Sequence, residues 1–600
     1  FSSDGKLLYF VSERDFNPVY SNTEWNHAYI DMSKPYMVTL AAGTTSPFQL
    51  ENDEVAIKED SSDTGKTIAK KNKEKTQKKT ADKPYPTVEV KIDETGLTDR
   101  IESLPVAPGN YYNLTATNEG LYYVAASFRT PGHLKFFDLK DKKETETGDI
   151  NSYSISNNQK KIIFKKGDDF FIEDVSKIKI EAKNKLNLSG LKINTDLHAE
   201  WKQIFDESWR QMRDYFYDPN MHGVNWKAMH DKYAVLLPYV NHRNDLTYII
   251  GEMIGELSIG HAYVNSGDRP EAERIKMGLL GATFSRDKSG YYKIDSILSG
   301  ESWDKTLVSP LRQPGVNVKK GDYIISINGK DVSRLDNIYQ ALIGKANQAI
   351  EILVNSKASV TGSRKIFVKP IDDESNLYYH EWVQQNIAKV TKASGGKIGY
   401  LHIPDMGPEG LNQFARYFYP QLDKEALIID DRGNGGGNVS PMIIERLRRV
   451  PGLGTMMRNA KTANIKPDAQ VGPKICLIDQ YSASDGDLFP YQFQFYKIGP
   501  LLGQRTWGGV VGIRGSLPFI DGADMRKPEF AHFSADGSRF IIEGYGVDPD
   551  IEVVNDPHQE YLGNDIQLLR AIEEMKRKLA EPGPKGVPPI PAFPDKSGKK

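Results

Sequence analysis

Short apolar runs separated by polar turns fill the first 180 or so residues of the chain. The segments 7–12, 121–124 and 162–164 are rich in Leu, Ile, Val, Tyr and Phe, and each follows polar turn residues. Short strands with regular turn signals are typical of a sandwich, barrel or propeller. Because the unit of polar turn and strand recurs, we expect residues 1–190 to form the C-terminal part of a β-propeller, with further blades upstream of Phe1.

A lysine-rich stretch at residues 55–85 interrupts this β pattern. It is strongly polar and includes the run from Lys70 to Lys75, so it cannot bury a core and is predicted to be a disordered insertion. Nucleic-acid binding is the weaker alternative, because no aromatic residues are interleaved with the lysines. The tail at 579–600, rich in proline and lysine, is also predicted to be disordered.

The apolar positions change to a helical period after about residue 196, which predicts a helical domain at 196–265. Two stripes repeat every three to four residues, as in amphipathic helices. They comprise Trp201, Ile204, Phe205, Trp209, Met212 and Phe216, then Leu246, Ile249, Ile250, Met253, Ile254 and Leu257. From 371 to 578, apolar strands such as 426–430 alternate with helical segments, which indicates an α/β core.

Between these two regions, residues 270–370 return to strand patterns. The segment 278–284 resembles the carboxylate-binding loop of a PDZ domain, and 320–329 resembles the strand and Asn-Gly turn beyond it. The resemblance implies a PDZ-like β domain, which captures an extended peptide by adding it to a sheet edge. It also gives Gly281, within the loop, a role in substrate binding.

Composition and charge exclude several classes of protein. The chain has 600 residues, too many for one core, and its net charge of −2 gives no electrostatic footprint for nucleic acid or an anionic membrane. No apolar run approaches the roughly 18 residues of a membrane span. The single cysteine, Cys476, can form no intramolecular disulfide and lies in an apolar strand pattern, so we expect it in the core.

A glycine loop at 433–437 lies between a predicted strand and a predicted helix. It lacks the Gly-Lys-Ser/Thr ending of a phosphate-binding loop, and Asn438 stands where a dinucleotide fingerprint needs glycine. Two interpretations remain, a tight turn without function and an oxyanion hole. In the second, a reacting carbonyl approaches the backbone N–H groups at the helix start.

Three further residues are ambiguous when each is taken alone. Ser484 begins a predicted helix, where it could attack a substrate or simply form a capping box with Asp487. His261 could be structural, and Glu543 could be a surface carboxylate. None of the eleven histidines stands in an H-E-x-x-H pair, so we expect neither a metal nor another cofactor.

Taken together, these segments resemble the tricorn protease family, which is related to the tail-specific peptidases. The resemblance runs from about 196 to 575 and rests on the motifs at 260–263, 430–437, 484–487, 506–512 and 543–550. It implies a multidomain protein with a β-propeller portion, a small helical domain, a PDZ-like domain and an α/β catalytic core of the ClpP/crotonase type.

By this resemblance, Ser484 attacks the peptide carbonyl and His261 is the general base. Glu543 belongs to the relay that orients the histidine, and the N–H groups of Gly437 and Asp485 form the oxyanion hole. Such a relay depends on geometry rather than on chain order. The family has a serine before the histidine, whereas this chain has Gly260. Glu543 is therefore expected to reach His261 either directly or through water.

Substrate selectivity is assigned to a separate set of residues. Gly508 and Gly509 of the 506–512 motif are expected to bind substrate. The family places a carboxylate between the glycine loop and the nucleophile, where it pairs with a basic substrate residue. Here that position is Thr455, and no acid lies between Glu445 and Asp468. We therefore expect no strong preference for lysine or arginine before the cut.

The expected function is that of a serine endopeptidase acting on oligopeptides or unfolded proteins. The competing class is a non-catalytic peptide- or ligand-binding protein on the same fold. Catalysis is favoured because the nucleophile, the base and the oxyanion glycines are all present. The family resemblance further implies a homo-oligomer, a hexamer, in the cytoplasm. A periplasmic location is the alternative, because a chain that begins at Phe1 shows no signal peptide to assess.

Overall fold

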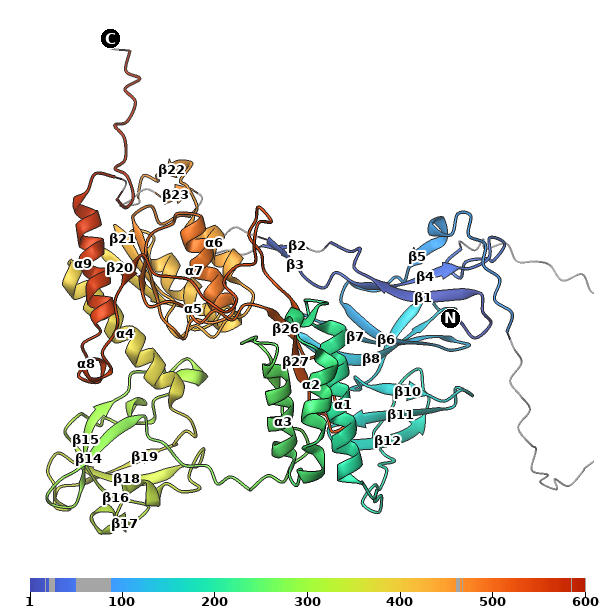
Figure 1. The fold of residues 1–600 in the computed structure, drawn as a ribbon, viewed down its shortest axis with the longest axis horizontal. Coiled ribbons are helices and arrows are strands. Elements are labelled where there is room, and N and C mark those ends of the chain that lie inside the picture. Colours follow the sequence, from blue (N-terminus) through green and yellow to red (C-terminus); the bar gives the residue numbers. More distant parts are fainter. Residues whose placement is uncertain are drawn as a thin grey trace, which may run out of the picture. The chain divides into compact units, whose positions relative to one another are not determined.

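The computed structural model describes most of the chain, in two compact units. The described residues are 1–16, 18–20, 27–49, 88–459, 464–466, 468–583 and 585–598. The units are Phe1–Asn194 and Thr195–Lys600, and their elements are labelled in Figure 1. The insertion predicted at 55–85 lies outside the described residues.

The first unit consists of antiparallel sheets. Their strand orders are β1-β4-β5, β2-β3, β6-β7-β8-β9 and β10-β11-β12. The bounds are β1 Leu7–Ser12, β2 Pro18–Tyr20, β3 His27–Tyr29, β4 Lys34–Thr39, β5 Ile101–Ser103, β6 Asn110–Ala116, β7 Gly120–Ser127, β8 Thr130–Asp138, β9 Lys143–Gly148, β10 Tyr153–Ile155, β11 Lys161–Lys166 and β12 Asp169–Asp174. Along β7, Leu121 and Tyr123 pack into one core cluster and Tyr122 and Val124 into another. Because alternate side chains point to opposite faces of a strand, β7 is buried on both.

The second unit opens with the predicted helical region. Its helices are α1 Leu197–Tyr215, α2 Trp226–Ala234 and α3 Arg243–Gly255. Asp196 caps α1 by accepting the N–H groups of His198 and Ala199, as an N-cap aspartate does. Both apolar stripes face one core, which also includes Phe519 and Met525 from the far end of the chain. The short strand β13, Tyr263–Val264, pairs with β27, Met525–Phe530.

The PDZ-like domain is a sheet of order β14-β15-β16-β18-β19, with β17 paired to β16. Its strands are β14 Ala282–Arg286, β15 Tyr292–Ile297, β16 Tyr323–Ile327, β17 Lys330–Asp331, β18 Ile350–Asn355 and β19 Arg364–Val368. Asn328 and Gly329 both have positive φ, 48° and 75°, which is the tight hairpin turn that an Asn-Gly pair predicts. β14 lies at the edge of the sheet.

The α/β core is a parallel sheet of order β20-β21-β24-β25-β28 with helices on both faces (Figure 1). The strands are β20 Ile398–His402, β21 Ala426–Asp430, β24 Lys474–Ile478, β25 Leu501–Gly503 and β28 Ile551–Glu552. One face packs against α5 Pro408–Phe418, α6 Ser440–Leu447 and α7 Asp485–Phe495, and the other against α4 Ser375–Ser394 and α9 Ile566–Ala580. Helix α8, Pro557–Tyr561, precedes α9, and Cys476 is fully buried in β24.

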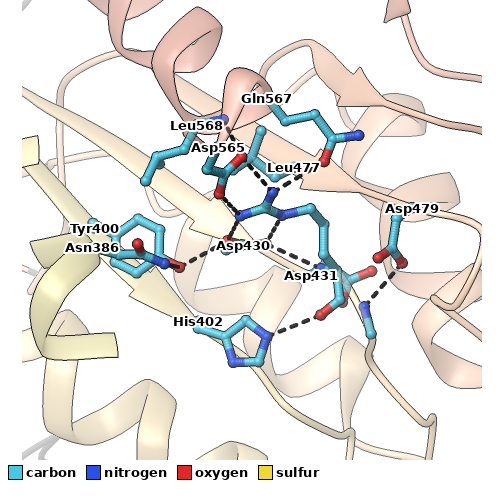
Figure 2. Close-up of polar contacts among 12 residues, drawn as sticks. Asn386, Tyr400, His402, Asp430, Asp431, Leu477, Asp479, Asp565, Gln567 and Leu568 are labelled. Carbon is cyan, nitrogen blue, oxygen red and sulfur yellow. Dashed lines mark hydrogen bonds and ion pairs between the residues drawn. The ribbon is translucent and has the colours of Figure 1, made fainter. Parts of the chain in front are cut away.

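A buried ionic network fixes the carboxyl end of β21, just before the glycine loop (Figure 2). The Arg432 guanidinium donates to both carboxylate oxygens of Asp430 and to those of Asp565, which caps α9. The Arg432 carbonyl accepts from His402 Nε2 at 3.0 Å. A buried charge without partners is strongly destabilising, whereas this arginine is fully paired. The network therefore ties the start of the glycine loop to the core.

Candidate active site

Ser484 lies at a strained turn between β24 and the start of α7. Its φ of 57° and ψ of −119° are unusual for a residue with a side chain. Hydrolases present a nucleophilic serine at such a strand–turn–helix position. The Ser484 side chain makes no capping hydrogen bond, so the capping-box interpretation is wrong. A Cβ on Gly436 would lie 2.6 Å from the Ser484 Cβ, which explains the glycine there.

Two backbone N–H groups lie free beside this serine. In the described part of the chain, neither Gly437 N–H nor Asp485 N–H has a hydrogen-bond acceptor. The neighbouring groups are engaged, because Met406 N–H donates to Gly436 O and Asn438 N–H to Met406 O, both at 2.8 Å. A Cβ on Gly436 would also lie 3.1 Å from Asp485 N, so the loop and the helix start are in contact. An oxyanion hole requires two such free donors, and this role for Gly437 and Asp485 stays a prediction.

Asn434 holds the glycine loop in place, a role that the sequence analysis missed. Its side-chain nitrogen donates to Ile403 O at 3.0 Å, and its side-chain oxygen accepts the Gly436 N–H at 2.9 Å. Its own carbonyl accepts the Ala483 N–H at 2.9 Å. The fully buried Asn434 therefore joins the loop to the residue before the nucleophile.

His261 is oriented by a backbone carbonyl. Its Nδ1–H donates to Val511 O at 2.6 Å, and its ring packs edge-on to Trp507 at 5.9 Å. Because Nδ1 carries the proton, Nε2 has the free lone pair that a general base needs. Burial lowers the pKa of His261 below its ordinary value, although the Val511 hydrogen bond and the charge of Glu543 oppose this. The lowered pKa favours the neutral imidazole, which is the form that can accept a proton.

Glu543 binds the N–H groups of the same backbone segment whose Val511 carbonyl contacts His261. Its Oε2 accepts the N–H groups of Val510 and Val511 at 2.7 and 3.0 Å. Among the described residues it makes no hydrogen bond to His261, so the Val510–Val511 backbone stands between the two. The direct contact expected as one alternative is therefore not formed, and bridging by water stays a prediction. The preceding Ile542 has a φ of 71°, an outlier for a β-branched residue, and this strain fixes how Glu543 enters the site.

A second carboxylate, Asp487, holds the other end of this segment. Its Oδ1 accepts the Gly508 N–H at 2.7 Å and its Oδ2 the Gly509 N–H at 3.4 Å. These two N–H groups are therefore engaged within the chain, and substrate binding by Gly508 and Gly509 stays a prediction. Burial raises the pKa of Asp487 to about 6. The loop that carries Trp507 and Val511 is thereby attached to α7, three residues after Ser484.

Trp507 connects the segment before Ser484 with His261. The Trp507 N–H donates to Ser482 O at 3.0 Å, and the Trp507 ring contacts His261. The described residues show no direct hydrogen bond between Ser484 and His261. Such bonds are often long in unliganded enzymes and tighten in the substrate complex.

The other two predicted substrate-binding residues lie away from this site. Thr455 is exposed on the hairpin of β22, Leu453–Thr455, and β23, Asn464–Lys466, so its effect on selectivity stays a prediction. The Gly281 N–H, expected to meet a peptide carboxylate, donates instead to Glu374 Oε1 at 2.6 Å. The PDZ-like loop is therefore already occupied.

Two negative findings apply to the described residues. No three His, Cys, Asp or Glu side chains lie together as a metal site would need. No helix there has the length and apolar character to cross a membrane. The absence of a metal from the reaction stays a prediction.

Models of four protein domains match the chain in sequence order. They are the tricorn protease second beta propeller domain at 1–176, the tricorn protease C1 domain at 197–255, the tricorn protease PDZ domain at 278–373 and peptidase family S41 at 397–553. The predicted fold class is confirmed by these matches and by the structure.

Two curated relatives and one solved structure resemble nearly the whole chain. The tricorn protease homolog 1 of Streptomyces coelicolor is 33% identical over 98% of this chain and 56% of its own length. The tricorn protease of Thermoplasma volcanium is 30% identical over 96% of this chain and 53% of its own. The crystal structure of the tricorn protease matches with a TM-score of 0.84 and 28% identity, over 97% of this chain and 54% of that one.

The chain thus spans little more than half the length of these relatives. Its domains and their order agree with the same family throughout. The chain belongs to the tricorn protease family.

Proposed function

We propose that this chain is a serine endopeptidase that cleaves oligopeptides or unfolded proteins. The observation that carries the proposal is the strained Ser484 at the start of α7, beside the free N–H groups of Gly437 and Asp485. The Asp485 N–H is free as a first-turn helix donor, and the exposed loop residue Gly437 places a second free donor beside it. Donors aimed at a developing oxyanion are among the largest contributions to enzymatic rate.

The first half-reaction forms an acyl-enzyme. Ser484 Oγ attacks the peptide carbonyl carbon while its proton passes to His261 Nε2. The carbonyl oxygen becomes an oxyanion, which accepts from Gly437 N–H and Asp485 N–H. The C–N bond then breaks as His261 Nε2–H protonates the leaving amine, which leaves an ester on Ser484.

The second half-reaction repeats these steps with water. Water gives a proton to His261 Nε2 and attacks the ester carbonyl, and the same two N–H groups stabilise the second oxyanion. The C–O bond to Ser484 breaks as Oγ recovers the proton. The Val511 carbonyl keeps Nδ1 protonated throughout and favours the imidazolium that forms.

A fluorophosphonate probe tests this proposal directly. We expect the probe to label Ser484, as shown by peptide mapping, and Ser484→Ala to lower peptide hydrolysis by about four or more orders of magnitude without unfolding the protein. Cys476→Ala is the control for a thiol nucleophile and should retain activity. Absence of labelling in the full chain, or normal turnover by Ser484→Ala, would favour a non-catalytic binding protein on the same fold.

The proposal also covers the oligomeric state of the protein and its location in the cell. The resemblance to the family supports a homo-oligomer, a hexamer, in the cytoplasm. Light scattering of the purified chain tests the first point, and a monomer at micromolar concentration would contradict it. Fractionation of the source cells would separate cytoplasmic from periplasmic protein.

A further inference from the structure

The loop before β14 presents backbone N–H groups to a carboxylate. Gly281 N–H donates to Glu374 Oε1 at 2.6 Å. The N–H of Ala282 lowers the pKa of the same carboxylate. Gly281 has a φ of 69°, which turns successive N–H groups toward one point. Such a backbone concavity captures the carboxylate at the C-terminus of a peptide.

The adjoining strand is suited to the rest of such a peptide. β14 pairs with β15 on one side, and in the described part of the domain no strand pairs with its other side. An exposed edge can accept an extended peptide as an additional strand. The carboxylate loop and the free edge are continuous, so together they fit a peptide that ends in a free carboxylate.

Glu374 enters this loop from the segment that leads into α4. Ile371 exchanges two backbone hydrogen bonds with Leu279, at 2.7 and 3.0 Å, so the segment runs beside the loop as a short strand. Asp372 pairs with Lys276. Glu374 then places its side-chain carboxylate where a peptide terminus would bind, and α4 begins at the next residue.

We propose that the Gly281 loop is a carboxylate site whose internal ligand is Glu374, and that the C-terminal carboxylate of a peptide displaces it. The description of that peptide as a substrate rests on the proposed function. The exchange itself is a binding reaction that does not depend on Ser484. Because α4 leads directly into β20, the release of Glu374 occurs at the junction between the PDZ-like domain and the catalytic core.

Burial acts against the charged form of Glu374. It raises the pKa of Glu374 above its ordinary value, and the charge of Asp373 adds to this. A peptide C-terminus has an intrinsic pKa of about 3.3 to 3.7, so it is fully charged at neutral pH. If Glu374 occupies the loop for nine-tenths of the time, it reduces the apparent affinity for a peptide about tenfold.

Peptide binding to the full chain tests the exchange, in a Ser484→Ala background that prevents cleavage. The probe is a pool of fluorescein-labelled peptides with randomised C-terminal residues, as free acids and as amides. We expect Glu374→Gln and Glu374→Ala to bind the acid pool about tenfold more tightly than the parent, with no gain for the amide pool.

Glu381→Gln is the matched control. Glu381 also lies on α4 and accepts the Ser299 N–H of the PDZ-like domain at 2.8 Å, but it does not contact the Gly281 loop. This variant should leave both affinities unchanged. The proposal is overturned if folded Glu374 variants bind the acid pool no better than the parent, or if their affinity for the amide pool rises equally. Glu374 would then only attach α4 to the domain. Labelling of Ser484 by the probe tests the peptidase function, and peptide binding tests the exchange at Gly281. Either proposal can therefore fail without the other.

Discussion

Two glycine loops of the second unit offer backbone N–H groups to oxygen, and they differ in whether those groups are free. Gly437 N–H is unpaired beside Ser484, whereas Gly281 N–H is held by Glu374. The difference fits the charge that each loop is proposed to bind. An oxyanion exists only during reaction, so its donors must be empty at rest. A site for a stable carboxylate can instead bind a side chain of the same protein at rest, and a peptide carboxylate can then displace that side chain.

Among the variants that test this comparison, the largest expected effect comes from adding one methyl group to the Gly437 loop, with the same change in the Gly281 loop as its counterpart. A Cβ at Gly437 would lie 2.0 Å from Met406 O, so the loop must shift. Because this moves an oxyanion donor, Gly437→Ala should lower kcat about 100- to 1000-fold on a short blocked peptide. Gly281→Ala, with a Cβ 2.8 Å from Ser309 Oγ, should leave that kcat within about threefold, since the blocked peptide has no free carboxylate to bind.

Steady-state kinetics with matched thermal unfolding curves separate these outcomes. If both alanine variants lost kcat equally while folded, the two loops would not have separate functions.

A smaller effect should distinguish two ways of orienting His261. Glu543→Ala leaves the Val510 and Val511 N–H groups without an acceptor, so the loop shifts and kcat should fall about 100-fold. Glu543→Gln keeps an acceptor oxygen and should lose less than about tenfold. In a direct carboxylate–histidine pair, the amide would select the wrong tautomer and cost about 10,000-fold. A loss of that size in Glu543→Gln would contradict orientation through the Val511 carbonyl.

The smallest effect concerns side-chain selectivity, which neither glycine loop provides. Thr455→Asp should introduce a preference for lysine or arginine before the cut. Because Thr455 is exposed on β22, the new ion pair should be worth only about 1 kcal/mol, or roughly fivefold in kcat/KM. Thr455→Asn is the uncharged control, and a peptide library scored for the residue before the cut is the measurement. A dominant basic preference in the unmodified chain would refute the prediction.

The sequence predicted elements well where local pattern decides them. The stripes of α1 and α3, the Asn328-Gly329 turn and the strand–turn–helix around Ser484 follow from period and turn chemistry. It did not predict which N–H group each carboxylate accepts. Asp487 suggested a helix cap, yet it holds Gly508, and Glu374 had no motif at all. Those contacts join residues 21 and 93 positions apart, which no local pattern encodes.

The pairing of β13 with β27 has a consequence for the growing chain. His261 and the Val511 carbonyl that orients it are 250 positions apart, and β27 is completed only at Phe530. Domains fold as units during synthesis, beginning at the N-terminal side. When Ser484 leaves the ribosome, the Val511 segment that orients His261 and the strand β27 have therefore not yet folded. If the proposed function holds, the polypeptide is inactive while it is made, and its site is completed only when β27 pairs with β13.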